Sequence, residues 1–527
     1  MSFLGLGILS WMTFLPVAGM VLVLLLPKEN KNAVRWLTAI ITGVQLLLSV
    51  FIYMNFNRGL AGINTQEGFQ FIEKASWIDI KSVAWFGRVH IDYFLGIDGI
   101  SVLMVILTAL VSFVATFASW GIEKSVKGYF ALFLLLDAGM MGVFVSLDFF
   151  LFYVFWEIML LPMYFLIGVW GGPRREYAAI KFFLYTFAGS VLMLIALIAL
   201  YFATGTKLGA QSFDMVSMMG GHFSDLTINL LGMSFSFEKF FFVMLFIGFA
   251  IKVPIFPFHT WLPHAHVQAP TAVSVILAGV LLKMGTYGYL RISYPMFPQA
   301  AHYFADAIAW LGLINIIYGA LCAMAQTDVK KLIAYSSVSH MGFVMIGIAA
   351  MTTEGMNGAV LQMFNHGLST SMMFLLVGIL YERSHHRWIV TPEGKKGFGG
   401  LYTQMPQYSI IFIIGLFASL GLPGLSGFIS EALVFIGVYT IYPTIAFCAL
   451  LGLIFGAAYL LWMFKRMFFG EVIESNKEYH DVNGREIFYM APLCLLVIAF
   501  GLYPSPVLDM MKASVGKLVI DLAKFAS

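Results

Sequence analysis

Long apolar runs separated by short polar segments dominate this sequence. A helix that crosses a membrane needs about 20 consecutive, mostly apolar residues, and about fourteen such runs occur along the chain. They lie near 3–26, 36–55, 95–119, 128–147, 149–170, 178–202, 239–257, 271–291, 303–325, 331–351, 356–382, 407–440, 443–468 and 487–505. The pattern predicts an all-α polytopic membrane protein with about fourteen transmembrane helices.

Three longer segments contain no such run: 56–94, 203–238 and the tail that begins at Pro506. The tail mixes apolar residues with lysines, a pattern typical of a helix that lies on the membrane surface. A frayed, solvated terminus is the alternative. The first 26 residues have no basic start and no small-residue cleavage site, so we expect a retained first span rather than a cleaved signal.

Prolines interrupt two of the apolar runs. Pro254 and Pro257 fall at the end of the seventh run, and Pro423 falls within the long twelfth run. Proline has no N–H to donate to the residue four positions earlier, so Pro254 should free the carbonyl of Ala250. At membrane depth, free backbone groups occur only where they are buried in protein or line a wet cavity. The two breaks therefore predict a water-lined path.

Interrupted helices at corresponding places in two halves of a chain are typical of transporters built from inverted repeats. The fourth to eighth runs would match the ninth to thirteenth. The chain is predicted to divide into an N-terminal three-helix region with an outward loop (1–127), a first five-helix repeat with an inward half-channel (128–291), a second five-helix repeat with an outward half-channel (303–468), and a last helix with a surface tail (487–527).

The composition agrees with a lipid environment. Hydrophobic residues make up 60% of the chain and charged residues 11%, and the mean hydropathy is +0.89. A soluble domain has about 25% charged residues, so lipids are expected partners. A net charge of +3 is too small to indicate nucleic acid. The three cysteines are scattered without CxxC or Cys/His spacing, so we predict no disulfide framework, metal site or iron–sulfur cluster.

The distribution of lysine and arginine predicts the orientation. The chain has 30 lysine and arginine residues. If the N-terminus faces outward, 17 of these basic residues lie on one side of the membrane and ten on the other. Basic loops stay in the cytoplasm, so both termini are predicted on the outer side of a bacterial-type inner membrane. The remaining three cations, Lys181, Lys252 and Lys283, lie within spans or at their edges.

Charged side chains within spans cost roughly 2.5–3.5 kcal/mol each on insertion scales, so they face the protein interior and find partners. Lys252 and Lys283 are such residues, and Glu157 and Glu431 are acidic counterparts on other spans. Salt bridges that only hold helices together are the alternative. Two lysines and two glutamates over four spans favour a path for charge. Candidate helpers are Asp137, Lys181, His259 and His264.

Two histidines, His340 and His366, lie on consecutive spans. Imidazole titrates near neutral pH, which suits a proton relay between lysine and glutamate. Ligation of a haem by both rings is a second reading, but the serines, threonines and Asn365 around them favour ordered water.

Five strings in this sequence carry a family resemblance: FWEIMLLPMYFLIGVWG, IKVPIFPFHTWLPHAH, APTAVSVILAGVLLKMGTYGYLR, KKLIAYSSVSHMGF and LPGLSGFISE. They resemble the antiporter-like subunit M of proton-translocating NADH:quinone oxidoreductase, respiratory complex I, whose mitochondrial counterpart is subunit 4. The resemblance runs from about residue 90 to 505. It separates this family from its relatives L and N chiefly because Glu431 stands where those carry lysine.

The resemblance implies fourteen helices with two inverted five-helix repeats, in the membrane arm beside the L and N subunits. It also implies a role for each candidate residue: Glu157 and Lys252 as the coupling pair, Lys283 as the central relay, His340 and His366 along the connecting axis, and Glu431 at the outward half-channel. FMN, iron–sulfur clusters and quinone are expected on other subunits, and no cofactor on this one. One departure is WLPHAH in place of the common WLPDAH, so that His264 replaces an acid.

The expected function is that of a subunit without a redox site of its own in a translocase. The subunit would move H⁺ through the Glu/Lys/His path while quinone is reduced elsewhere in the complex. The alternatives are a subunit of a multi-subunit cation/proton antiporter, a relative in a ferredoxin- or hydrogenase-linked complex, and a structural membrane scaffold.

Overall fold

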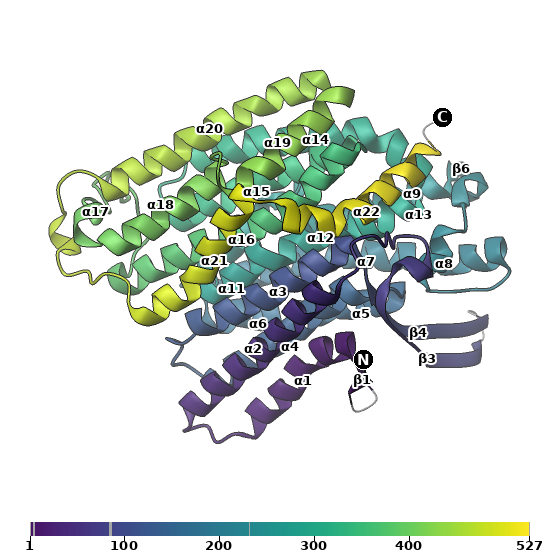
Figure 1. Cartoon of the computed structure of the whole chain (residues 1–527), viewed down its shortest axis with the longest axis horizontal. Coiled ribbons are helices and arrows are strands. Elements are labelled where there is room, and N and C mark those ends of the chain that lie inside the picture. Colours follow the sequence, from purple (N-terminus) through teal and green to yellow (C-terminus); the bar gives the residue numbers. More distant parts are fainter. Residues whose placement is uncertain (1, 4–5, 84–86, 231, 526–527) are drawn as a thin grey trace.

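The computed structural model describes residues 2–3, 6–83, 87–230 and 232–525. Figure 1 shows an elongated bundle of long helices, with the β3–β4 hairpin and the C-terminus at the same end of the bundle. Within the described residues, twelve continuous helical segments are long and apolar enough to cross a membrane. The prediction of a helical polytopic membrane protein is confirmed.

The N-terminal part contributes three long helices and two hairpins. Its elements are β1 (Ser2–Phe3), β2 (Leu6–Gly7), α1 (Ile8–Leu25), α2 (Lys31–Asn55), η1 (Gln66–Gly68), β3 (Gln70–Val83), β4 (Gly87–Ile97) and α3 (Gly99–Ala118). Strands β3 and β4 pair antiparallel from Gln70↔Ile97 to Val83↔Gly87. Segment 56–94, for which the sequence predicted only a loop, therefore contains most of a β-hairpin outside the helical body.

The middle part contains the first break. Its elements are α4 (Val126–Val145), α5 (Phe149–Ile158), α6 (Leu160–Trp170), α7 (Arg175–Leu208), α8 (Met215–Met219), η2 (Phe223–Asp225), β5 (Thr227–Leu230), β6 (Met233–Ser236), α9 (Phe237–Lys252), η3 (Phe258–Thr260), α10 (Trp261–Gln268), α11 (Thr271–Ile276), η4 (Leu277–Leu281), α12 (Leu282–Gly288), η5 (Tyr289–Ser293) and α13 (Tyr294–Met296). Pro254 and Pro257 stand between α9 and α10. The segments η4 and η5 are π-helical turns on either side of α12.

The C-terminal part contains the second break. Its elements are α14 (Pro298–Met324), α15 (Val329–Ala349), α16 (Thr353–Ser384), α17 (Leu401–Gln404), α18 (Pro406–Leu420), α19 (Ser426–Ile441), α20 (Pro443–Phe468), η6 (Glu474–Asn476), α21 (Gly484–Leu502) and α22 (Ser505–Ala523). Pro423 stands between α18 and α19. Both predicted runs that contain these prolines are therefore interrupted. Two further runs are divided without having been predicted to be: 149–170 into α5 and α6, and 271–291 by the π-helical turns η4 and η5.

The tail forms helix α22, so the frayed alternative is wrong, while its predicted position on the membrane surface stays a prediction. The helix packs against α3 and α16, and Ser514 accepts a hydrogen bond from the Gly99 N–H at 3.0 Å. Near its end, Asp521 accepts hydrogen bonds from Asn64 (2.8 Å), Lys517 (2.9 Å) and Lys524 (2.6 Å). Partial burial raises the pKa of Asp521, but the two lysines outweigh burial and hold this pKa below its ordinary value.

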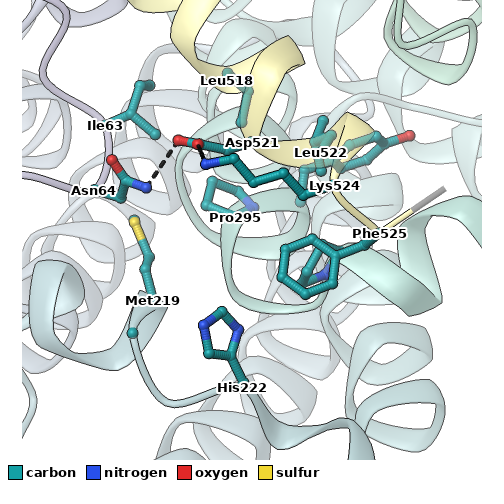
Figure 2. A pocket seen from close by; sticks show the side chains of 13 residues that line it. Ile63, Asn64, Met219, His222, Pro295, Leu518, Asp521, Leu522, Lys524 and Phe525 are labelled. Carbon is teal, nitrogen blue, oxygen red and sulfur yellow. Dashed lines mark hydrogen bonds and ion pairs between the residues drawn. The ribbon is translucent and has the colours of Figure 1, made fainter. Parts of the chain in front are cut away.

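Figure 2 shows this end of α22 beside a cavity of about 310 Å³. Asp521, Lys524 and Phe525 line the cavity on one side, and His222 lines it on the other. Because Asn64 belongs to the segment after α2, its hydrogen bond to Asp521 ties the C-terminal helix to the N-terminal part of the chain.

The innermost helices are the ones on which most of the predicted charge path lies. In the most apolar 18-residue stretch of each span, all residues are buried in 271–296 and in α16, and 94% are buried in α15. The corresponding share of buried residues is 39% in α2 and 33% in α20. Lys283, His340 and His366 therefore lie at the centre of the bundle, where lipid does not reach them.

Candidate functional site

Lys252 is the last residue of α9, next to the first break. Its side chain is buried, and its Nζ has no hydrogen-bond partner among the described residues. The ammonium lies 5.2 Å from the ring centroid of Trp156 and 5.7 Å from that of Phe182. Aromatic faces at this distance attract a cation electrostatically, and they hold Lys252 in an otherwise apolar pocket.

The backbone around the first break is more fully bonded than the sequence predicted. The Ala250 carbonyl accepts the N–H of Ile255 at 2.9 Å, so the prediction that it is left free for water is wrong. Asn315 on α14 accepts the N–H of Phe256 at 2.6 Å and donates to the Pro254 carbonyl at 3.2 Å. A side chain from a neighbouring helix thus replaces the helical hydrogen bonds that proline removes.

Glu157 lies near the end of α5, where one of its carboxylate oxygens is buried without a partner in the described structure. Its charge interacts with that of Lys252 through space. The two groups are not in direct contact, because Lys252 Nζ has no bonded partner. Glu157, which is partly buried, and the buried Lys252 are therefore electrostatic neighbours without a direct bond, and their role as a coupling pair stays a prediction.

Lys283 and His366 are in direct contact at the centre of the bundle. The distance from Lys283 Nζ to His366 Nδ1 is 2.7 Å, and Nζ also donates to the carbonyl of Ala278. Lys283 lies on α12 between the two π-helical turns. Such turns are common at functional sites because they disturb the regular helical hydrogen bonds.

His366 leads to the second break through His340. The ring centroids of these two histidines are 5.5 Å apart, and His340 Nδ1 is 3.4 Å from Glu431 Oε1. The structure therefore arranges four predicted residues in one series, Lys283, His366, His340 and Glu431.

Glu431 lies against the backbone of the second break. Its carboxylate accepts from Gln362 Nε2 at 3.3 Å, and a Cβ at Gly421 would stand 2.6 Å from its other oxygen. Gly421 has a φ of +75°, a conformation that glycine adopts without steric cost. The sharp turn at Gly421 thus makes the space in which the Glu431 carboxylate lies.

Polar residues that the sequence analysis did not select surround Glu431. Gln362 accepts a hydrogen bond from Ser430 at 2.5 Å, and Asn365 donates to the Ser426 carbonyl at 2.7 Å. Gln362, Asn365 and His366 share one face of α16, because residues three and four apart are neighbours on a helix. That spacing was the signal that could have found them.

The structure does not bring Lys252 into contact with Lys283. Helices α9 and α12 meet backbone to backbone at Gly285, where a Cβ would stand 2.7 Å from the Phe249 carbonyl oxygen. The two lysines belong to separate buried groups, one with Glu157 and one with His366.

Two further polar residues, His266 and Lys330, are buried in the bundle. His266 on α10 is fully buried, and neither of its ring nitrogens has a hydrogen-bond partner among the described residues. Its ring stacks on that of Phe374, with the two ring centroids 4.4 Å apart. His266 interacts electrostatically with both Lys283 and Lys330. The sequence assigned Lys330 to a cytoplasmic loop, but it is 5% exposed and donates to the Ala269 carbonyl at 2.6 Å.

Arg291, which the sequence placed in an outward loop, is also buried. Its guanidinium lies 2.5 Å from Asp98 and 3.1 Å from the Tyr287 hydroxyl, and both charged residues are at most 1% exposed. The assignment failed because Arg291 is the last residue of the run 271–291, and its partners Asp98 and Ser101, at the start of α3, are distant in sequence.

The candidate helpers fall into two places. Asp137 on α4 accepts from Ser112 at 2.6 Å and is buried away from the series just described. Lys181 on α7 lies 3.4 Å from Nδ1 of His264 on α10 and interacts electrostatically with His259 in η3, so these three lie near the first break. Among the described residues, no group of three or more His, Cys, Asp or Glu could hold a metal ion.

Comparison with known proteins gave consistent matches. Residues 146–500 match the family model described as NADH:quinone oxidoreductase/Mrp antiporter, TM. NADH-quinone oxidoreductase subunit M of Rhodobacter capsulatus is 42% identical over 522 residues, covering 97% of this chain and 96% of that protein. NADH-ubiquinone oxidoreductase chain 4 of Chondrus crispus is 40% identical and covers 94% of both.

Two solved structures share the fold. A chain of respiratory complex I from Thermus thermophilus with bound NADH has a TM-score of 0.81 and 28% identity, over 97% of this chain and 99% of that one. A chain of the membrane-bound sulfane sulfur reductase, an archaeal respiratory membrane complex, has a TM-score of 0.78 over 94% of this chain and 76% of that one. At 23% identity, the second match concerns the fold alone.

Proposed function

The chain belongs to the NADH:quinone oxidoreductase/Mrp antiporter membrane family, and from this we propose that it is the subunit M type of component in the membrane arm of a proton-translocating NADH:quinone oxidoreductase. It moves H⁺ across the membrane while quinone is reduced on other subunits. Its relatives of almost equal length bear the subunit M and chain 4 names, which supports this role over that of an Mrp-type antiporter subunit.

The observation that carries the proposal is the buried series from Lys283 to Glu431. Ionisable groups at membrane depth are costly and mark paths for ions or protons. Here lysine, two imidazoles and a carboxylate follow one another with contacts of 2.7 Å and 3.4 Å at the two ends. An imidazole can accept a proton on one nitrogen and release one from the other, so the two histidines connect Lys283 with Glu431.

The coupling step occurs at Glu157 and Lys252. A nearby carboxylate favours the charged form of a buried amine, and burial alone favours the neutral form. Movement of Glu157 toward Lys252 or away from it therefore changes how firmly the lysine holds its proton. Releasing one charge against 100 mV requires about 2.3 kcal/mol, which a change in this pair can supply.

The remaining assignments follow from the same role. The two five-helix segments, 128–291 and 303–468, act as inverted repeats that contain the inward and the outward half-channel. Both termini lie on the outer side of a bacterial-type inner membrane. Subunits of the L and N type are the neighbours, and the flavin, the iron–sulfur clusters and the quinone belong to other subunits.

The proposal is tested first at the coupling pair. Lys252→Met and Glu157→Gln should each lower proton uptake into vesicles and coupled quinone reductase turnover several-fold, because each removes one charge of the pair. Both rates are measured on the purified complex in sealed vesicles, with Lys465→Met, an exposed lysine on α20, as the control. Normal rates in both variants would remove the pair from the mechanism.

Composition of the purified assembly separates the rival functions. NADH-oxidising peripheral subunits should co-purify with this chain, whereas an Mrp-type antiporter would bring only small membrane partners. A Soret absorption band in the pure assembly, assigned to this chain by its loss in His366→Ala, would instead favour the haem reading.

The turn beside Glu431 provides a second test. Gly421→Ala should lower proton translocation because the new Cβ would collide with the Glu431 carboxylate. Gly424→Ala is the matched control, since it also has a positive φ, +92°, but no neighbour within 4 Å of the added Cβ. Both variants cost about 1–2 kcal/mol of backbone energy, visible in thermal unfolding. Equal translocation in the two variants would contradict the role of the Glu431 carboxylate.

A further inference from the structure

A pocket of about 300 Å³ lies on the side of the bundle that carries the predicted cytoplasmic loops. It is formed where α7 begins, where α10 ends, and where the segments before α15 and after α16 meet. Its walls include Arg174, His264, Asp328, Lys331 and Arg387. None of these five residues belongs to the series from Lys283 to Glu431.

Positive charge dominates this pocket. Arg174, Lys331 and Arg387 line it, and Lys181 adjoins it through His264. The single lining carboxylate, Asp328, is already engaged, since it accepts the backbone N–H groups of Lys330 and Lys331 and lies 3.4 Å from Arg387. Within the residues that the structure describes, Arg174, Lys331 and Lys181 have no carboxylate partner.

His264 lines the pocket together with Arg174 and Lys331, and its Nδ1 lies 3.4 Å from Lys181 Nζ. It interacts electrostatically with Lys181, Lys331 and Arg174, and its Nδ1 is 2.8 Å from the Thr260 carbonyl. An imidazole cannot neutralise a cation as a carboxylate does. The pocket therefore contains several positive charges close to His264, which carries no negative charge to neutralise them.

We propose that this pocket binds a phosphate group, presented by an anionic phospholipid or as a free ion. Guanidinium and ammonium groups bind phosphate oxygens through short, charge-assisted hydrogen bonds, and basic pockets between membrane helices on the cytoplasmic side suit lipid head groups. The aromatic rim supports the lipid source: Tyr177 is 57% and Trp388 37% exposed beside the cations, as is typical of side chains at the membrane–water interface.

The test measures lipid binding to the intact complex. The complex is stripped of lipid in detergent and titrated with phosphatidylglycerol, with phosphatidylcholine, and with inorganic phosphate as a competitor, and bound lipid is counted by native mass spectrometry. Arg174→Gln/Lys331→Gln should bind one equivalent of phosphatidylglycerol fewer than wild type, or bind it at least about 100-fold more weakly, the loss expected for two charge-assisted contacts. Lys465→Gln/Arg466→Gln, an exposed basic pair on α20, is the matched control and should bind like wild type.

Charge at His264 gives a second, sharper comparison. His264→Asp should weaken binding at least as much as the double variant, because the new carboxylate neutralises the cations from within. His264→Asn removes the imidazole without adding charge and should leave binding close to wild type. Equal binding by the two His264 variants would overturn the proposal.

The remaining outcomes are also decisive. Displacement of the lipid by inorganic phosphate at millimolar concentration identifies a site for free phosphate, and retention of the lipid identifies a head-group site. Unchanged binding of both probes in Arg174→Gln/Lys331→Gln overturns the proposal, as does a carboxylate of a neighbouring subunit found in the pocket. None of these measurements depends on proton movement, so they are independent of the proposed function.

Discussion

Replacing Lys283 with methionine is expected to reduce proton translocation by the assembled complex by more than about tenfold, since one positioned proton-transfer group contributes about 10²–10⁴ to a rate. The reason is geometric. Lys283 Nζ is the bonded neighbour of His366 at 2.7 Å, and methionine removes the proton carrier at that point while keeping a similar volume. Proton uptake in sealed vesicles and quinone reductase turnover are the two readouts, and both should fall because they are coupled.

Lys283→Arg distinguishes a relay from a structural cation. Arginine keeps the positive charge but does not lose its proton in proteins, so we expect it to be as inactive as methionine. A merely structural role would be restored by arginine. Near-normal translocation in Lys283→Arg would therefore contradict the relay, and Lys465→Met provides the control for an exposed lysine on α20.

Breaking the buried pair between Asp98 and Arg291 should have the largest effect on stability. Removing one partner of a buried ion pair costs about 3–5 kcal/mol, because the other charge is left uncompensated. Arg291→Met leaves Asp98 buried with only the backbone N–H groups of Ile100 and Ser101 as partners. We expect a marked fall in the thermal unfolding midpoint of the complex, or loss of the chain from it.

Two further variants make this result specific. Asp98→Asn/Arg291→Met removes both charges and should be less destabilised than the sum of the single variants, as expected for residues in contact. Lys31→Met breaks the exposed pair with Glu123, whose side chains are 44% and 64% exposed, and should change stability by only about 0–1 kcal/mol. Additive effects at Asp98 and Arg291 would show that their contact contributes little.

The buried pair also illustrates a class of residue that pattern reading misassigns. Arg291 and Lys330 directly adjoin apolar runs, and counting charges by side placed both in loops. In the structure Arg291 pairs with Asp98 at the start of α3, and Lys330 bonds to the carbonyl of Ala269. A charge near the end of a span is exposed or buried according to which neighbouring element covers it, and a linear pattern does not contain that information.

Local chemistry allowed the sequence by itself to determine the helical membrane body and its two proline breaks. The length of each apolar run decides whether a helix can span lipid, and proline removes a helical hydrogen bond wherever it stands, so the breaks at Pro254 and Pro423 depend on no distant residue. The same reasoning identified Lys283, His340, His366 and Glu431, because a charge or imidazole inside an apolar run needs a partner.

Only the tertiary structure decided which of these groups meet. Lys283 and His366 are 83 positions apart and yet in contact, whereas Lys252 and Lys283 lie closer in sequence and belong to separate groups. His266 and Gln362 joined the polar interior only once α10 and α16 were packed beside their neighbours. Contact between side chains depends on how helices pack against one another, and that packing results from many weak interactions across the whole chain rather than from any single run of residues.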